Sequence, residues 1–176
     1  MLTQTDARAV ADRFGASDNQ IRRDHLISHL LAALSEHVAD RVIFFGGTAL
    51  SRTLLPDGRL SEDIDLIAVG SRSELAELLT VVLPRALRRE YPRLIWDPSL
   101  TDVRDVESAL LRSPDGLTVR LQLLDSVGYP KWPVTAVDLV QRYGDAPPAR
   151  LTTPTPPAFA AWKTAAWFDR AAARDL

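Results

Sequence analysis

The chain has 176 residues, of which 46% are hydrophobic and 25% charged, values typical of one globular domain. It contains no cysteine, which excludes disulfides, thiolate zinc sites and a cysteine nucleophile. Residues 1–11 lack the apolar segment of a signal peptide, and no apolar run reaches the ~20 residues of a membrane span, so we expect a cytoplasmic protein. The formal net charge of −2 means that nucleic acid would have to bind to a local basic patch.

The first forty residues predict two helices, over residues 3–14 and about 18–37, the second with apolar residues at helical spacing and a cap at Ser17 or Asp18. Three histidines, His25, His29 and His37, lie near one face of this second helix. An i, i+4 histidine pair can bind zinc, but the sequence reveals no third ligand. We therefore favour hydrogen bonds between helices for these side chains over a metal site.

The remaining chain predicts helices mixed with four or five strands, which gives an α/β or α+β domain with a small mixed sheet flanked by helices. Strands are expected at residues 42–45, 63–69, 93–97, 106–111 and 117–124. Helices are expected at residues 48–55, at 71–89 with a kink at Pro84, and from 159 to the end. Residues 147–157 are rich in proline and are expected to form a loop.

A pair of glycines, Gly46-Gly47, separates the first strand from the helix that follows it. Glycine lets the backbone approach a ligand closely, and the free N–H groups at the start of a helix attract phosphate. Taken alone, such a pair more often marks a plain turn than a binding site.

Two carboxylates follow on the next strand, where Asp63 and Asp65 alternate with apolar residues and so point to one face. At about 6.6 Å apart along the strand they repel each other unless a cation lies between them. Mg²⁺ prefers such oxygen ligands. An isolated pair would indicate a solvated edge strand, but the order of strand, Gly-Gly, helix and Asp-x-Asp favours a metal site.

A basic stripe is expected near the end of the chain. Lys163, Trp167, Arg170 and Arg174 fall on one helix face at 100° per residue. A solvated helix face is the usual fate of such a stripe. However, only two of the 21 basic residues are lysine, and Lys163 lies among alanines, which suits binding to a triphosphate.

These segments resemble the AbiEii/AbiGii-type toxins of the polymerase-β nucleotidyltransferase superfamily. The matching residues are 45–50 (FGGTAL), Arg59 and 61–66 (SEDIDL). Near the end, Lys163, Ala166, Arg170 and residues 174–176 (RDL) resemble that family's Lys-x-x-Ala and Arg-Asp motif.

The resemblance implies an enzyme that transfers a nucleoside monophosphate from an NTP to an acceptor hydroxyl, with Mg²⁺ or Mn²⁺ bound by Asp63 and Asp65. It also implies a toxin with a cognate antitoxin and the 3′ end of tRNA as acceptor. The expected catalytic residues are Asp63, Asp65, Lys163 and Asp175. The expected nucleotide-binding residues are Gly46, Gly47, Thr48, Arg52, Ser61, Lys163 and Arg170.

The resemblance further implies one domain over residues 1–176, with helices in 1–40, a polymerase-β-like catalytic core in 41–145 and a C-terminal helix in 156–176. Related chains continue for several helices, so we expect a truncated or naturally short member. The superfamily's third carboxylate aligns with Gln122, and Asp125 is the nearest acidic substitute.

Two other functions stay open from the sequence. One is nucleotidylation of a protein or a small molecule. The other is a degenerate module that binds a nucleotide or a protein, which the neutral Gln122 supports. Further residues that we expect to be structural or solvated are Arg85, Arg88, Arg89, Arg93, Trp96, Trp132, Trp162 and Trp167.

Overall fold

The computed structural model describes residues 1–127 and 131–170, with only the course of the helix for 166–170. The helices are α1 (Gln4–Phe14), α2 (Asp18–Val38), α3 (Gly46–Arg52), α4 (Arg72–Ala86) and α5 (Pro156–Arg170). The strands are β1 (Val42–Phe45), β2 (Asp63–Ala68), β3 (Ile95–Trp96), β4 (Ser108–Arg112), β5 (Thr118–Leu124), β6 (Val134–Asp138) and β7 (Arg150–Pro154). This mixed composition confirms the predicted α/β class.

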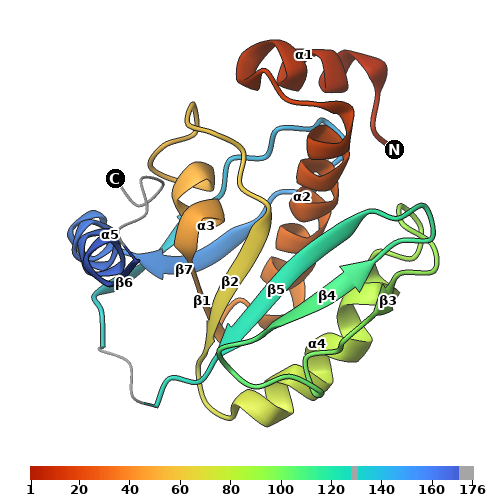
Figure 1. Cartoon of the computed structure of the whole chain (residues 1–176). Helices are drawn as coiled ribbons and strands as arrows, with labels where there is room; N and C mark the ends of the chain where they lie inside the picture. The colour runs from red at the N-terminus through yellow and green to blue at the C-terminus, as the bar shows by residue number, and fades with distance from the viewer. Residues whose placement is uncertain (128–130, 171–176) are drawn as a thin grey trace.

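The strands form one mixed sheet in the order β3-β4-β5-β2-β1-β7-β6 (Figure 1). Strand β2 lies at its centre, antiparallel to β1 and parallel to β5. Strand β1 is also parallel to β7. This arrangement places Asp65 between Phe45 of β1 and Gln122 of β5, and it places Asp63 opposite Arg120.

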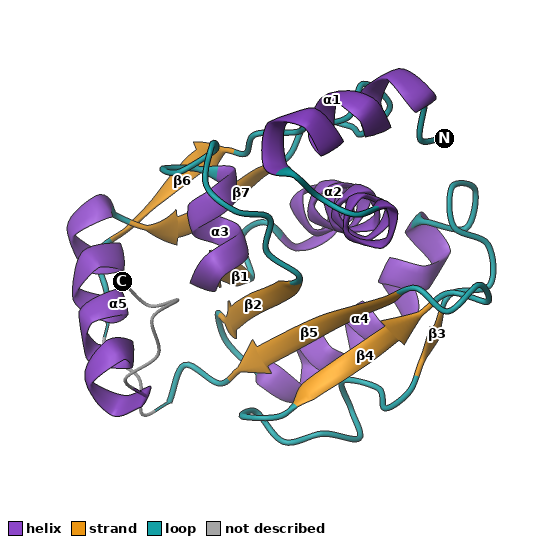
Figure 2. Cartoon of the chain, turned by 45° about the horizontal axis from the view of Figure 1, so that its top comes forward, coloured by secondary structure: helices purple, strands orange, loops and turns teal. Residues whose placement is uncertain are grey.

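The two faces of the central strands differ in polarity. Ile64 and Leu66 of β2 and Leu121 and Leu123 of β5 are buried, because they face the helices α2 and α4 that cover one side of the sheet (Figures 1 and 2). The residues between them, including Asp63 and Asp65, point to the other side. The alternation that the sequence predicts for residues 63–69 is therefore present over residues 63–66, whereas residues 66–68 are all buried and the strand ends at Ala68.

Three helices begin at the residues that the sequence predicts, because each has a side chain to satisfy its first N–H groups. The hydroxyl of Thr3 accepts from the N–H of Asp6, and that of Ser71 accepts from the N–H of Glu74. At the start of α2, Ser17 and Gln20 form a capping box. Helix α4 continues through Pro84 and ends two residues later.

Strands β6 and β7 are not predicted from the sequence. Pro133 precedes β6, Pro154 ends β7, and prolines at these positions suggest a loop in the sequence. Strand β6 is also mostly exposed at the edge of the sheet, so its residues do not alternate in polarity. Helix α3 begins at Gly46 rather than at residue 48, and it ends at Arg52 rather than at residue 55.

A buried ionic network joins α2, α3 and the segment between β6 and β7. Asp24, 2% exposed, accepts from Arg52 at 2.8 Å, from Arg142 at 3.1 Å and from the hydroxyl of Tyr143 at 3.0 Å. Arg52 is fully buried, and burial lowers its pKa to about 10 even though the charge of Asp24 raises it. The Arg52 guanidinium also donates to the carbonyl of Val140 at 3.0 Å.

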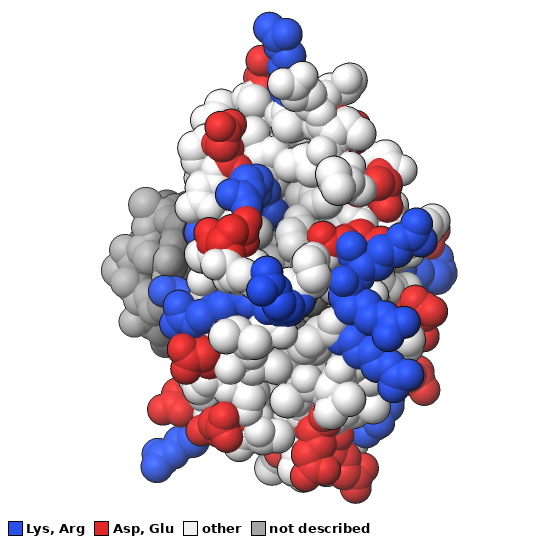
Figure 3. Space-filling model, turned by 90° about the vertical axis from the view of Figure 1, so that its right-hand side faces the viewer, with Lys and Arg blue, Asp and Glu red and all other residues white. Residues whose placement is uncertain are grey.

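The surface is mixed in charge. Figure 3 shows one face, on which Lys and Arg side chains gather across the middle with acidic side chains beside them. Several surface arginines form ion pairs, such as Arg22 with Asp115 and Arg112 with Asp97. No helix in the described ranges has both the length and the apolar character to cross a membrane.

Candidate active site

A cavity of about 280 Å³ lies on the polar side of the sheet, at the ends of the central strands. Four parts of the chain line it: the turn from β1 into α3, the segment between α3 and β2, the strands β2, β4 and β5, and one side of α5. The lining residues are Phe45, Gly46, Gly47, Arg59, Ser61, Asp63, Asp65, Ser108, Arg120, Gln122, Phe159, Trp162 and Lys163.

Gly46 and Asp65 are in contact at the base of this cavity. Gly46 has a φ of +77°, in the left-handed region that favours glycine. A Cβ atom at this position would lie 2.8 Å from Cγ of Asp65 and closer still to one carboxylate oxygen. The glycine is therefore required both by the turn and by the position of the Asp65 carboxylate.

The rest of the turn is fitted to the segment before β2. A Cβ atom at Gly47 would lie 2.9 Å from the hydroxyl oxygen of Ser61, so the glycine leaves room for that side chain. Thr48 is buried and does not line the cavity. Its hydroxyl donates to the carbonyl oxygen of Asp63 and so attaches α3 to the first residue of β2.

Strand β5 contributes Arg120 and Gln122, which are in register with Asp63 and Asp65. The side-chain NH₂ of Gln122 donates to the carbonyl of Val106 at 2.8 Å, which orients its amide. Asp125 is not among the residues that line the cavity, and its carboxylate accepts from the N–H of Val127 at 3.0 Å. Of the two candidates for the third carboxylate position, the structure places Gln122 at the cavity.

Helix α5 closes the cavity with Phe159, Trp162 and Lys163. The Trp162 ring stacks on Phe45, with centroids 4.1 Å apart and planes at 17°, and Trp132 lies parallel to it at 6.1 Å. Trp162 is half-buried and packs against the small core cluster of Phe45, Ile67 and Leu124, in keeping with the structural role that the sequence suggests. It forms part of an aromatic wall beside the basic group of Lys163.

Some residues predicted for the nucleotide site lie elsewhere. The prediction for Arg52 is not met, because its buried guanidinium pairs with Asp24 beneath α2 and does not reach the cavity. Asp175 and Arg174 lie outside the described residues, as do the side chains of Ala166, Trp167 and Arg170. Conversely, Arg120, Ser108 and Phe159 line the cavity without a motif in the sequence to reveal them.

The lining combines oxygen ligands with basic groups. The carboxylates of Asp63 and Asp65 and the amide of Gln122 are the hard oxygen donors that Mg²⁺ and Mn²⁺ prefer, so this donor set fits a divalent cation. The basic groups in the lining are those of Arg59, Arg120 and Lys163. Basic groups next to a divalent cation are suited to a polyphosphate.

Comparison with known proteins places the chain among transferases. The family described as "Nucleotidyl transferase AbiEii toxin, Type IV TA system" matches residues 29–176. A solved structure of an antigenic nucleotidyltransferase-like protein from Paracoccidioides brasiliensis is similar, with 18% identity and a TM-score of 0.48 over 84% of this chain and 68% of that chain. No curated protein matches the sequence.

Proposed function

We propose, since the chain belongs to the AbiEii nucleotidyl transferase toxin family, that it transfers a nucleoside monophosphate from an NTP to the 3′-terminal hydroxyl of tRNA. The acceptor oxygen bonds to the α-phosphorus, the bond from that phosphorus to the bridging oxygen breaks, and pyrophosphate leaves with the electron pair. The acceptor proton passes to a carboxylate of the cavity. The observation that carries the proposal is that Asp63, Asp65 and Lys163 line the same cavity.

Asp63 and Asp65 are the proposed ligands of Mg²⁺ or Mn²⁺, and the oriented amide of Gln122 offers a neutral oxygen beside them. A divalent cation bound there would neutralise phosphate charge and favour ionisation of the acceptor hydroxyl. The chain itself supplies the alignment. Gly46 leaves the space that the Asp65 carboxylate occupies, and Thr48 holds the backbone of Asp63.

Gly46→Ala is expected to reduce the rate of transfer by about 100-fold, because a displacement of about 1 Å in a reacting group can cost that much. The added methyl group would overlap the Asp65 carboxylate. The positive φ would also lower the free energy of unfolding by about 1–2 kcal/mol. Initial rates and urea unfolding of the purified variant measure the two effects separately.

Gly116→Ala is the matched control. Gly116 has a φ of +85°, but a Cβ atom there would meet nothing within 4 Å. This variant should show a similar loss of stability with an unchanged rate. Equal rates in Gly46→Ala and Gly116→Ala would show that the contact with Asp65 has no part in the reaction.

Lys163 is proposed to bind the triphosphate together with Arg59 and Arg120. Lys163→Ala is expected to lower kcat/KM for the NTP by about 10- to 100-fold, because a hydrogen bond to a charged group contributes about 1.5–3 kcal/mol. Steady-state kinetics at varied NTP concentration measure the change in kcat/KM.

The control is Lys131→Ala, because Lys131 is exposed and does not line the cavity. An equal loss of kcat/KM in both variants would show that Lys163 does not bind the NTP.

The acceptor is inferred from the family and from charge. The family description, a type IV toxin–antitoxin system, also implies an antitoxin partner, and we place the reaction in the cytoplasm, where tRNA is used. With a formal net charge of −2, the protein needs local basic groups to hold tRNA. Binding should then weaken steeply as salt concentration rises.

The decisive experiment incubates the purified chain with each α-³²P-labelled NTP, Mg²⁺ and total tRNA. We expect label on tRNA and release of pyrophosphate, and no label on tRNA whose terminal diol has been oxidised with periodate. Label on the protein or on a small molecule instead would support the alternative acceptors. No label with any NTP would indicate a binding module without transferase activity.

A further inference from the structure

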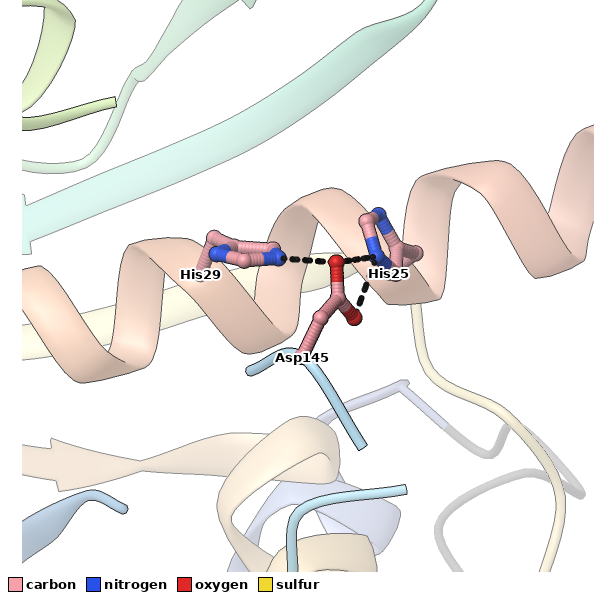
Figure 4. A group of neighbouring side chains, drawn as sticks. All are labelled: His25, His29 and Asp145. Atoms are coloured by element: carbon pink, nitrogen blue, oxygen red, sulfur yellow. Dashed lines mark hydrogen bonds and ion pairs between the residues drawn. The ribbon is translucent and has the colours of Figure 1, made fainter. Parts of the chain in front are cut away.

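A second group of polar side chains lies outside the cavity, between α2 and the segment that links β6 to β7. His25 and His29 are one turn apart on α2, and Asp145 approaches both from the linking segment (Figure 4). The two histidines are 2% and 6% exposed, and the Asp145 side chain is 21% exposed. None of the three lines the cavity of the proposed active site.

One ring nitrogen of His29, Nε2, is buried without a hydrogen bond to any of the described residues. Buried polar atoms are nearly always paired, so such an atom calls for an explanation. Nε2 of His29 points towards the carboxylate of Asp145, with Oδ2 at 3.5 Å (Figure 4).

The distances between the three side chains fit a tetrahedral cation. Nε2 of His25 lies 3.0 Å and 3.2 Å from the two carboxylate oxygens of Asp145, and the ligand atoms of the three residues all lie within 4.8 Å of one another. In a tetrahedral zinc site with bonds of about 2.0–2.1 Å, neighbouring ligand atoms are about 3.3 Å apart. Small adjustments of side chains would therefore admit an ion.

The surroundings of His25 also match a metal ligand. Its other ring nitrogen, Nδ1, bonds to the hydroxyl of Tyr91, and a hydrogen bond of this kind orients a metal-binding histidine. Burial lowers the pKa of His25, although its hydrogen bond to Asp145 and the charge of that residue raise it. Burial raises the pKa of Asp145, but hydrogen bonds from the amino group of Met1 and from His25 lower it to about 2.

We propose that His25, His29 and Asp145 bind one Zn²⁺ ion, with water as the fourth ligand. Two imidazole nitrogens and one carboxylate suit zinc, whereas the oxygen ligands of the cavity suit Mg²⁺. The ion joins the first half of α2 to the β6–β7 segment. The carboxylate of Asp145, which contacts the amino group of Met1 in this structure, turns to the ion.

Zinc binding is tested on the full chain after removal of metals with a chelator, in an Asp63→Asn/Asp65→Asn background that eliminates the acidic pair of the cavity. Titration with ZnCl₂ in excess Mg²⁺, followed by calorimetry, should give one ion per chain and a higher Tm. Co²⁺ in its place should give the intense visible absorption of a tetrahedral complex. A chain that binds no Zn²⁺, or whose Co²⁺ spectrum is octahedral, would overturn the proposal.

Variants assign the ligands. His29→Gln and Asp145→Asn should each weaken Zn²⁺ binding by at least about 100-fold, since loss of a residue that only hydrogen-bonds to a metal ligand already costs about 10- to 100-fold. His37→Gln is the control, because His37 lies on the same helix but is exposed. Circular dichroism checks that each variant is folded. Zinc affinity equal to that of His37→Gln in both ligand variants would place the ion elsewhere.

Discussion

Asp65→Asn is expected to lower the rate of nucleotide transfer by about 10²–10³-fold, the effect of removing one preorganised electrostatic group from an active site. The amide has the shape of the carboxylate but cannot neutralise a divalent cation. Asp65 lies at the centre of the sheet, between Phe45 and Gln122, so the substitution leaves the strand pairing in place. Initial rates with labelled NTP and tRNA measure the loss, and Asp63→Asn should behave similarly.

Asp125→Asn is the control for this experiment and also tests the third ligand position. Its carboxylate caps the turn after β5 and is not part of the cavity lining, so we expect a normal rate. A loss as large as that of Asp65→Asn would assign Asp125 to the metal site in place of Gln122.

In cells, growth arrest by the wild-type chain should disappear with Asp65→Asn, and arrest that persisted would indicate sequestration of a target instead of catalysis.

Asp24→Asn is expected to lower the free energy of unfolding by about 3–5 kcal/mol, the usual cost of removing one partner from a buried ion pair. Asp24 is the acidic partner of two buried guanidinium groups, those of Arg52 and Arg142. Without it, two positive charges stay buried side by side. Urea denaturation at pH 7, followed by circular dichroism, measures the change.

The control for Asp24→Asn is Asp57→Asn, which removes the acidic partner of Arg13 on the surface. Both of those side chains are exposed, so water replaces the lost interaction and little stability should be lost. If the two variants were equally stable, the network around Asp24 would contribute no more than a surface ion pair.

Local rules explain why part of the fold and site could be predicted from the sequence. Capping residues such as Thr3 and Ser71 define helix ends within a few residues. The alternation in β2 determines that Asp63 and Asp65 share a face, and the glycines at the start of α3 indicate a close approach.

The features that the sequence did not predict depend on contacts between segments far apart in the chain. The family resemblance implies that Arg52 binds the nucleotide, but its side chain pairs with Asp24, which the sequence does not place beside it. Asp145, the carboxylate that approaches His25 and His29, lies 120 residues after His25 in the sequence. Arg120 was missed because an arginine on a strand has no motif, and only the pairing of β5 with β2 places it at the cavity.

The order in which the cavity residues are synthesised has a consequence for the cell. Gly46 and the acidic pair of β2 leave the ribosome early, whereas Lys163 and the aromatic wall on α5 belong to the last described helix. At about 5–20 residues per second, translation from the glycines to α5 takes on the order of 6–23 s. Throughout that interval the nascent chain carries the proposed metal ligands but lacks one wall of the cavity. The cavity would therefore stay incomplete until α5 has been synthesised.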